Sequence, residues 1–152
     1  MSTAEFDGRL ARCLQPAGPV VIEALFFSAA DTVRLANVLG THGVVVRLID
    51  GAHLTGKADL LREVAAEFNF PGHFGANWDA LIDCWSDMSW LPAKGYVTIL
   101  LHADTFKATD PAAHDGFLTV CNDVAERWHG HDPKLPFKLL RGGEGHAKKT
   151  KN

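Results

Sequence analysis

Cysteine is scarce in this sequence and follows no recognisable spacing. The chain has 152 residues and only three cysteines, Cys13, Cys84 and Cys121. An odd number without a CxxC pair excludes a disulfide framework. The first residues contain no apolar segment of a secretion signal, and no apolar run approaches the length of a membrane span. We therefore expect a protein of the reducing cytoplasm that has no membrane segment.

Motifs of catalytic and metal-binding proteins are also absent. The sequence has no GxSxG elbow, no glycine-rich phosphate loop and no HExxH pair, although it contains 8 histidines. It also lacks the glycine and oxygen spacing of a calcium loop. Helix carboxylates that face open water keep ordinary pKa values and are poor acids at neutral pH. We therefore predict no enzymatic activity, no cofactor and no metal site.

Basic residues are missing from the middle of the chain, between Arg62 and Lys94. Residues 44–141 contain 13 acids and 9 bases, a net charge of −4, whereas residues 142–152 contain 1 acid and 3 bases. A nucleic-acid-binding protein would carry a basic patch. The charge balance therefore argues against direct binding of nucleic acid.

The gap in basic residues coincides with the most distinctive stretch of the chain, residues 73–88. Read as a helix at about 100° per residue, it places Asp79, Asp83 and Asp87 in one row at spacing i, i+4, i+8. Asn77 is the expected N-cap. The opposite arc is apolar and contains Trp78, Leu81, Ile82, Cys84, Trp85 and Met88. Cys84 is accordingly expected to be buried, as is Cys121 on a later apolar helix face.

The row of acids has three interpretations. Like charges at i, i+4 repel by a few tenths of a kcal/mol, so a helix selected for stability alone would interleave lysines. The simplest interpretation is still a solvated helix face. The others are a docking surface for a cationic partner, or carboxylates that serve catalysis or a metal ion.

Strand and helix patterns alternate along the rest of the chain. Apolar runs predict strands, and amphipathic stretches with caps predict helices. The expected strands cover 19–26, 44–50, 96–101 and 137–141, and the expected helices cover 28–39, 58–68, 104–108 and 110–128. Residues 1–18 support no assignment. The alternation predicts an α/β protein with a central parallel sheet of four strands flanked by helices.

The central part of the chain resembles the barstar family of intracellular ribonuclease inhibitors. The resemblance rests on Asp50-Gly51, Asp59-Leu60-Leu61, Phe70-Pro71 and, most specifically, the block from Gly75 to Cys84. It runs without a gap from about Val46 to Cys84 and more loosely to Arg141. It implies a barstar-like layered domain at 44–141 whose sheet has three family strands. Residues 1–43 are then an added strand and helix packed on the same domain, and 142–152 form a disordered basic tail.

The resemblance also implies a function and a set of contact residues. A family member would block the cationic active site of a microbial ribonuclease with its acidic helix and the preceding loop. Asp83 would meet the catalytic cations, Asp79 would flank it, and Gly75 and Asn77 would shape the loop. Asp123 falls where the family has a further acid on its fourth helix that contacts the nuclease.

Several positions of the block depart from the family pattern. The first aromatic residue of the family's loop is His73 here, whereas the second is kept as Phe74. The family's interface tryptophan is replaced by Ile82. After the helix, Ser86, Asp87 and Met88 stand where the family has Thr-Gly-Trp, and Asp87 adds a charge. These changes keep the acidic character and alter the shape of the contact surface.

Two functional classes remain open from the sequence. The first is an inhibitor, in a monomer or 1:1 complex, of a basic extracellular-type ribonuclease or a ribonuclease toxin; in the toxin case the chain would be an immunity protein. The second is a regulatory interaction module that uses the same acidic face on a basic partner that is not a nuclease.

Overall fold

Helices and strands alternate through the computed structural model, which describes residues 2–24, 28–72 and 74–142. The strands are β1 (Val21–Ala24), β2 (Val44–Asp50), β3 (Gly95–Leu101) and β4 (Phe137–Gly142). The helices are α1 (Thr3–Leu14), α2 (Ala29–Thr41), the 3-10 turn η1 (Gly51–His53), α3 (Lys57–Glu67), α4 (Trp78–Asp87), α5 (Ala103–Thr109) and α6 (Pro111–His131). The predicted tail, 143–152, lies outside the described residues.

All four strands run parallel in one sheet of order β1-β4-β3-β2. In the middle of the sheet, Ile99 of β3 lies opposite Leu48 of β2 and Leu140 of β4. On the far side of β4, Leu140 pairs with Ile22 of β1. The predicted α/β class and four-stranded parallel sheet are confirmed, including the extra strand contributed by the N-terminal segment.

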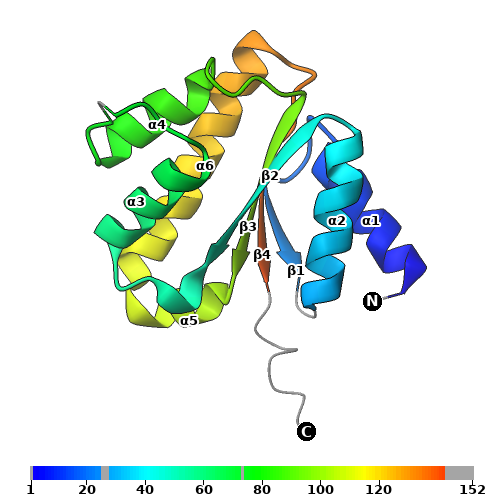
Figure 1. The fold of residues 1–152 in the computed structure, drawn as a ribbon, viewed down its shortest axis with the longest axis horizontal. Helices are drawn as coiled ribbons and strands as arrows, with labels where there is room; N and C mark the ends of the chain where they lie inside the picture. Colours follow the sequence, from blue (N-terminus) through cyan, green and yellow to red (C-terminus); the bar gives the residue numbers. More distant parts are fainter. Residues whose placement is uncertain (1, 25–27, 73, 143–152) are drawn as a thin grey trace, which may run out of the picture.

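Helices cover both faces of this sheet. Figure 1 shows α1 and α2 on one face and α3 to α6 on the other. The strands therefore bury side chains in two cores, which explains the near-continuous apolar run of β3. Trp85, Phe68 and Phe117 belong to the core beneath α3 to α6. Leu35 and Phe6 belong to the core beneath α1 and α2.

Helix α1 had no counterpart in the sequence analysis, yet its start carries a local signal. The Ser2 hydroxyl accepts from the Glu5 amide at 3.1 Å, and the Glu5 carboxylate accepts from the Ser2 amide at 2.9 Å. This reciprocal pair is a capping box, which satisfies two amides that a helix start leaves unpaired. Ser28 and Asp31 form a second box at the start of α2, the helix expected at 28–39.

Two basic residues of β4 tie the N-terminal segment to the rest of the molecule. Lys138 is only 1% exposed, and its ammonium group donates to the carbonyls of Ala17 and Pro19, each at 2.9 Å. Arg141, 8% exposed, donates from Nη1 to the Glu23 carboxylate at 2.6 Å. A buried cation needs such acceptors to offset its lost hydration. The N-terminal segment therefore supplies hydrogen-bond acceptors for both basic side chains of β4.

The prediction that Cys84 is buried was wrong, whereas the prediction for Cys121 is confirmed. Cys84 is half-buried because it lies at the edge of the apolar arc of α4, on the turn that carries Asp83 and Asp87. The position opposite the row of acids is taken by Leu81 and Trp85, both 0% exposed.

Candidate functional site

Helix α4 is positioned by the cap that the sequence predicted. The Asn77 side-chain oxygen accepts from the Ala80 amide at 2.8 Å, and its amide group lies 3.4 Å from the Gly75 carbonyl oxygen. Asp79 follows in the first turn, where the helix dipole favours a negative charge. The side chain of Asn77 is therefore already engaged in holding the loop and the helix start.

The row of acids on α4 faces solvent. Asp79, Asp83 and Asp87 are all exposed, and the side chain of Asp83 is 71% exposed. Neither Asp79 nor Asp87 has an ion-pair partner within the described part of the chain. The helix thus presents carboxylates that are free to accept hydrogen bonds from a second molecule.

Asp83 differs from its neighbours because it has an internal partner. Nη1 of Arg127, on α6, donates to Oδ1 of Asp83 at 3.0 Å. Arg127 is 55% exposed, so the pair lies at the surface. The sequence gap between Arg62 and Lys94 gave no sign of this cation, because α6 brings it from 44 residues further along the chain.

Packing between α4 and α6 holds this arrangement. The Trp128 indole N–H donates to the Trp85 carbonyl at 2.9 Å, and Trp85 stacks on Phe117 with ring centroids 5.7 Å apart. Near the start of α4, a Cβ at Gly116 would lie 3.1 Å from the Trp78 ring, so the helices approach closely there. Buried contacts of this kind fix the two helices relative to each other.

Asp123 lies one helical turn before Arg127 on α6 and is exposed. Helices α4 and α6 pack against each other (Figure 1), so the predicted Asp123 and the row on α4 belong to the same helix pair. We call the set Asp79, Asp83, Asp87, Asp123 and Arg127 the acidic surface.

The loop before α4 is anchored by aromatic contacts. Phe74 is half-buried and meets Phe70 edge to face at 5.2 Å, and Phe70 meets Trp90 at 5.8 Å. The Trp90 indole N–H donates to the Phe68 carbonyl at 2.9 Å. The predicted contact residue His73 lies outside the described residues.

The other predicted contact residues, Gly75, Ile82 and Ser86, differ in how exposed they are. Gly75 is exposed, and a Cβ there would make only ordinary contacts of 3.5 Å, so close packing does not require glycine. Ile82 is half-buried against the main core. Ser86 is 8% exposed and donates to the Ile82 carbonyl at 2.6 Å. Its hydroxyl proton is thus already used within α4, and little of the side chain is accessible to a partner.

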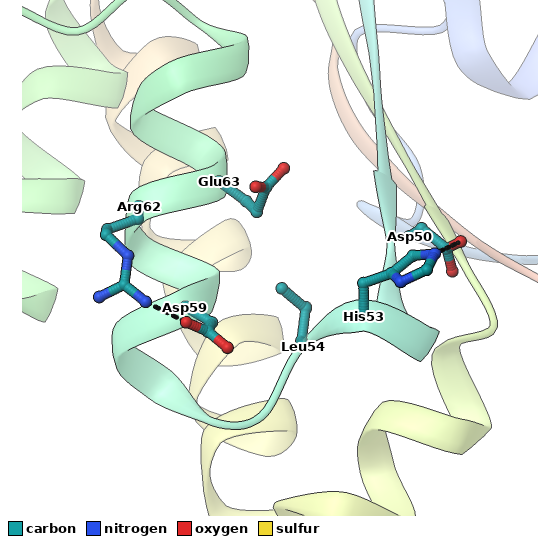
Figure 2. A pocket seen from close by; sticks show the side chains of 6 residues that line it. All are labelled: Asp50, His53, Leu54, Asp59, Arg62 and Glu63. Carbon is teal, nitrogen blue, oxygen red and sulfur yellow. Dashed lines mark hydrogen bonds and ion pairs between the residues drawn. The ribbon is translucent and has the colours of Figure 1, made fainter.

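A separate cavity of about 410 Å³ lies at the carboxyl end of β2. Figure 2 shows His53 beside Asp50 and Arg62 beside Asp59 in its wall. The His53 ring nitrogen lies 3.1 Å from Asp50 Oδ2, and Arg62 forms an ion pair with Asp59. Asp50, His53, Asp59 and Arg62 therefore engage one another, and Glu63 is the remaining titratable residue that lines the cavity.

Asp50 also interacts with His102, which follows β3. Burial raises the pKa of Asp50. Hydrogen bonds from the His102 ring and the Ala52 amide, together with the charges of His102 and His53, lower it by more than burial raises it, so the pKa lies below its ordinary value. The carboxylate therefore stays ionised and closes the turn after β2.

The described residues include no group of three or more histidine, cysteine or acidic side chains that could hold a metal ion. The same part of the chain includes no helix with the length and hydropathy needed to cross a bilayer.

Comparison with known proteins gives a family for the region that carries the acidic surface. The family model described as Barstar (barnase inhibitor) matches residues 44–141, which contain β2 to β4 with α3 to α6. No curated protein matches the chain. Members of that family are ribonuclease inhibitors rather than enzymes. The match covers more than half of the sequence, from the start of β2 to Arg141 in β4, and the chain belongs to the Barstar (barnase inhibitor) family.

Proposed function

We propose that this chain inhibits a basic microbial ribonuclease by covering its cationic active site with α4 and the preceding loop. The observation that carries the proposal is the exposed row of Asp79, Asp83 and Asp87 on a helix whose other face is locked into the core. A ribonuclease must present basic groups to bind phosphodiesters. Carboxylates on a rigid helix can take the place of the phosphates.

Each predicted contact except the buried Ser86 has a defined part in the proposal. Asp83 meets the catalytic cations, and Asp79 flanks it one turn earlier. Asp87 and Asp123 extend the negative potential, which speeds the encounter with a basic partner. The loop residues His73, Phe74, Gly75 and Asn77 with Ile82 shape the rest of the contact.

The partner is a basic ribonuclease of the extracellular type or a ribonuclease toxin, bound 1:1 in the cytoplasm. With a toxin partner the chain acts as an immunity protein. Inhibition requires no cofactor and no catalysis by the chain itself.

The test combines capture with an inhibition assay. Tagged parent protein and the variant with Asp79→Asn and Asp83→Asn are used to capture binding proteins from culture supernatants and lysates of neighbouring microbes. Captured proteins and purified barnase are assayed for ribonuclease activity with and without the chain. We expect the parent to capture and inhibit a ribonuclease that the double variant releases, and the chain alone to leave RNA intact.

Single substitutions then measure the contribution of the row. Truncating one member of a desolvated charge pair costs about 2–5 kcal/mol in complexes that include barnase–barstar itself. Asp83→Ala should therefore weaken inhibition about 30-fold or more, at about 1.4 kcal/mol per factor of ten. Asp79→Ala should weaken it as well, and raised salt should slow association of the parent.

Asp7→Ala is the matched control, because Asp7 is an exposed acid on α1, across the sheet from α4. It changes the net charge equally and should leave inhibition within about twofold, as expected for independent distant sites. The proposal fails if Asp79→Ala and Asp83→Ala both inhibit the captured ribonuclease as tightly as the parent does. Capture of a non-nuclease protein through the same acids would instead identify a regulatory module.

A further inference from the structure

Arg127 is the base of the acidic surface, which otherwise consists of four aspartates. Most of its hydrogen-bond donors have no acceptor in the described part of the chain. A guanidinium carries five N–H donors. In the described part of the chain, Arg127 makes one side-chain hydrogen bond, from Nη1 to Asp83 Oδ1 at 3.0 Å. Its side chain is 55% exposed. The remaining donors have no acceptor among the described residues, and the exposed side chain leaves them accessible to water.

This position matters once the acidic surface is covered, and the inference rests on the proposed function. A typical stable complex buries about 800 Å² on each partner. Arg127 touches Asp83, the residue placed at the centre of the contact, and lies one turn from Asp123. A partner that reaches Asp83 and Asp123 therefore also covers Arg127.

Covering Arg127 would remove water from its free donors and bring it close to the cations that approach Asp83. Those cations would share the Asp83 carboxylate that Arg127 contacts. Burying a charge that is incompletely paired is costly, and buried donors without acceptors add to that cost. A carboxylate is the group that accepts from a guanidinium through two parallel hydrogen bonds. One such group on the partner would remove both penalties.

We propose that Arg127 determines the specificity of this surface by requiring a carboxylate on the ribonuclease beside the cations that meet Asp83. The partner is then basic around its active site with one acid facing Arg127. Ribonucleases whose surface is uniformly basic there are bound less tightly, because Arg127 repels them.

The experiment uses catalytically inactive barnase displayed on yeast, unmodified and as a library randomised at surface positions around the active site. The full-length parent, Arg127→Ala and Arg127→Glu are the baits. Arg12→Glu is the matched control, since Arg12 is an exposed arginine on α1, across the sheet, and the change in net charge is the same.

We expect clones retained by the parent and by Arg12→Glu to be enriched in Asp or Glu at one or more randomised positions. Clones retained by Arg127→Glu should carry Lys or Arg at the same positions. Clones selected by the parent should bind Arg127→Glu about 30-fold or more weakly, and clones selected by Arg127→Glu should bind the parent more weakly by a similar factor. This corresponds to loss of a close charge pair. Arg127→Ala should also weaken binding of the clones selected by the parent.

Two results would overturn the inference while the ribonuclease function stands. Clones retained by the parent could be no richer in acids than the unselected library. Alternatively, Arg127→Ala could bind the selected clones as tightly as the parent or more tightly, which would make Arg127 only an internal counterion that partners displace. If no bait retains unmodified barnase or any clone, the proposed function fails and the inference with it.

Discussion

Cys84 lies at the boundary between the buried and exposed sides of α4, and this position predicts its reactivity. Burial raises the pKa of its thiol, and the charges of Asp83 and Asp87 raise it further. Cys13 and Cys121 are both 0% exposed. The reactive species is the thiolate, which must be reached by the reagent. Cys84 is half-buried, whereas the other two cysteines are buried, so we expect Cys84 to react without unfolding.

In the folded protein we expect Ellman's reagent to modify one thiol, Cys84, slowly at neutral pH. Cys84→Ala should leave no thiol reactive until denaturant is added. Asp87→Asn should speed the reaction, because it removes one of the charges that disfavour the thiolate. Reaction of two thiols in the native protein would contradict the burial of Cys13 or Cys121.

At the scale of single residues, periodicity predicted which α4 side chains are exposed but not their partners. Asp79, Asp83 and Asp87 are exposed as their spacing indicated. The ion pair of Asp83 with Arg127 joins residues 44 positions apart, and no local pattern contains that information. An exposed pair of this kind contributes only about 0–1 kcal/mol to stability, so it is not a main source of the folding free energy.

At the scale of elements, the junction of β2 and η1 depends on close approach of another segment. A Cβ at Gly51 would lie 2.6 Å from the His102 carbonyl oxygen and 2.8 Å from that of Leu101. Both atoms belong to backbone at the end of β3. The turn after β2 therefore needs glycine because the neighbouring strand passes too near for a side chain.

Gly51→Ala should reduce the free energy of unfolding by about 1–3 kcal/mol, the usual cost of overpacking. Gly40→Ala is the control, since a Cβ added to this residue of α2 would meet no neighbouring side chain or strand of the described residues within 4 Å. That change should be neutral or stabilising by up to about 1 kcal/mol, because alanine favours helices. Urea unfolding measures both, and equal stabilities of the two variants would refute the close approach.

Element prediction from the sequence succeeded where caps and apolar patterns agree. α4 begins after Asn77 and α6 after Asp110, as expected. The first strand is shorter than the predicted 19–26, since β1 covers Val21–Ala24, and residues 25–27 lie outside the described part. Helix α1 was missed, although its capping box and the helical spacing of Phe6, Leu10, Cys13 and Leu14 are both readable signals.

At the scale of the whole molecule, the N-terminal segment covers a face of the sheet that the family region alone would expose. Val44, Val97, Ile99 and Leu140 of the family region pack in the core formed with α1 and α2. Leu35 of α2 is 0% exposed in that core, whereas Val33 on the same helix is 60% exposed.

Leu35→Ala should lower the free energy of unfolding by about 2–5 kcal/mol, as for other buried leucines. Val33→Ala, the matched control, should change it by no more than about 0.5 kcal/mol. Inhibition by folded Leu35→Ala should match the parent, since α2 and the acidic surface lie on opposite faces of the sheet (Figure 1). Loss of inhibition in a folded Leu35→Ala protein would place the N-terminal segment in the interface.

Whole-molecule stability should also fall at alkaline pH because of buried thiols. Burial raises the pKa of Cys13 from 9.0 to about 11. Between these values the unfolded chain has released the thiol proton while the folded chain keeps it, so stability falls as pH rises. Burial of Lys138 lowers the pKa of its ammonium and acts in the opposite direction below pH 10.5.

The contribution of Cys13 is isolated by comparing the parent with Cys13→Ala. The stability advantage of the parent over this variant should shrink by about 1 kcal/mol between pH 8 and pH 10, which follows from the linkage of pKa to stability. Urea unfolding at the two pH values measures it, and the effect of Lys138 largely cancels in the difference. An advantage that does not change with pH would show that the Cys13 thiol titrates normally in the folded chain.

The sequence by itself determined the features that depend on near neighbours. The cap at Asn77, the row of acids and the alternation of strands with helices follow from local spacing, because helix and strand periodicity act over a few residues. The tertiary structure alone decided where distant backbone and side chains meet. It placed Arg127 beside Asp83, Lys138 beneath the Ala17 and Pro19 carbonyls, and the end of β3 against Gly51. Such contacts depend on how whole helices and strands pack, and no short stretch of sequence encodes that packing.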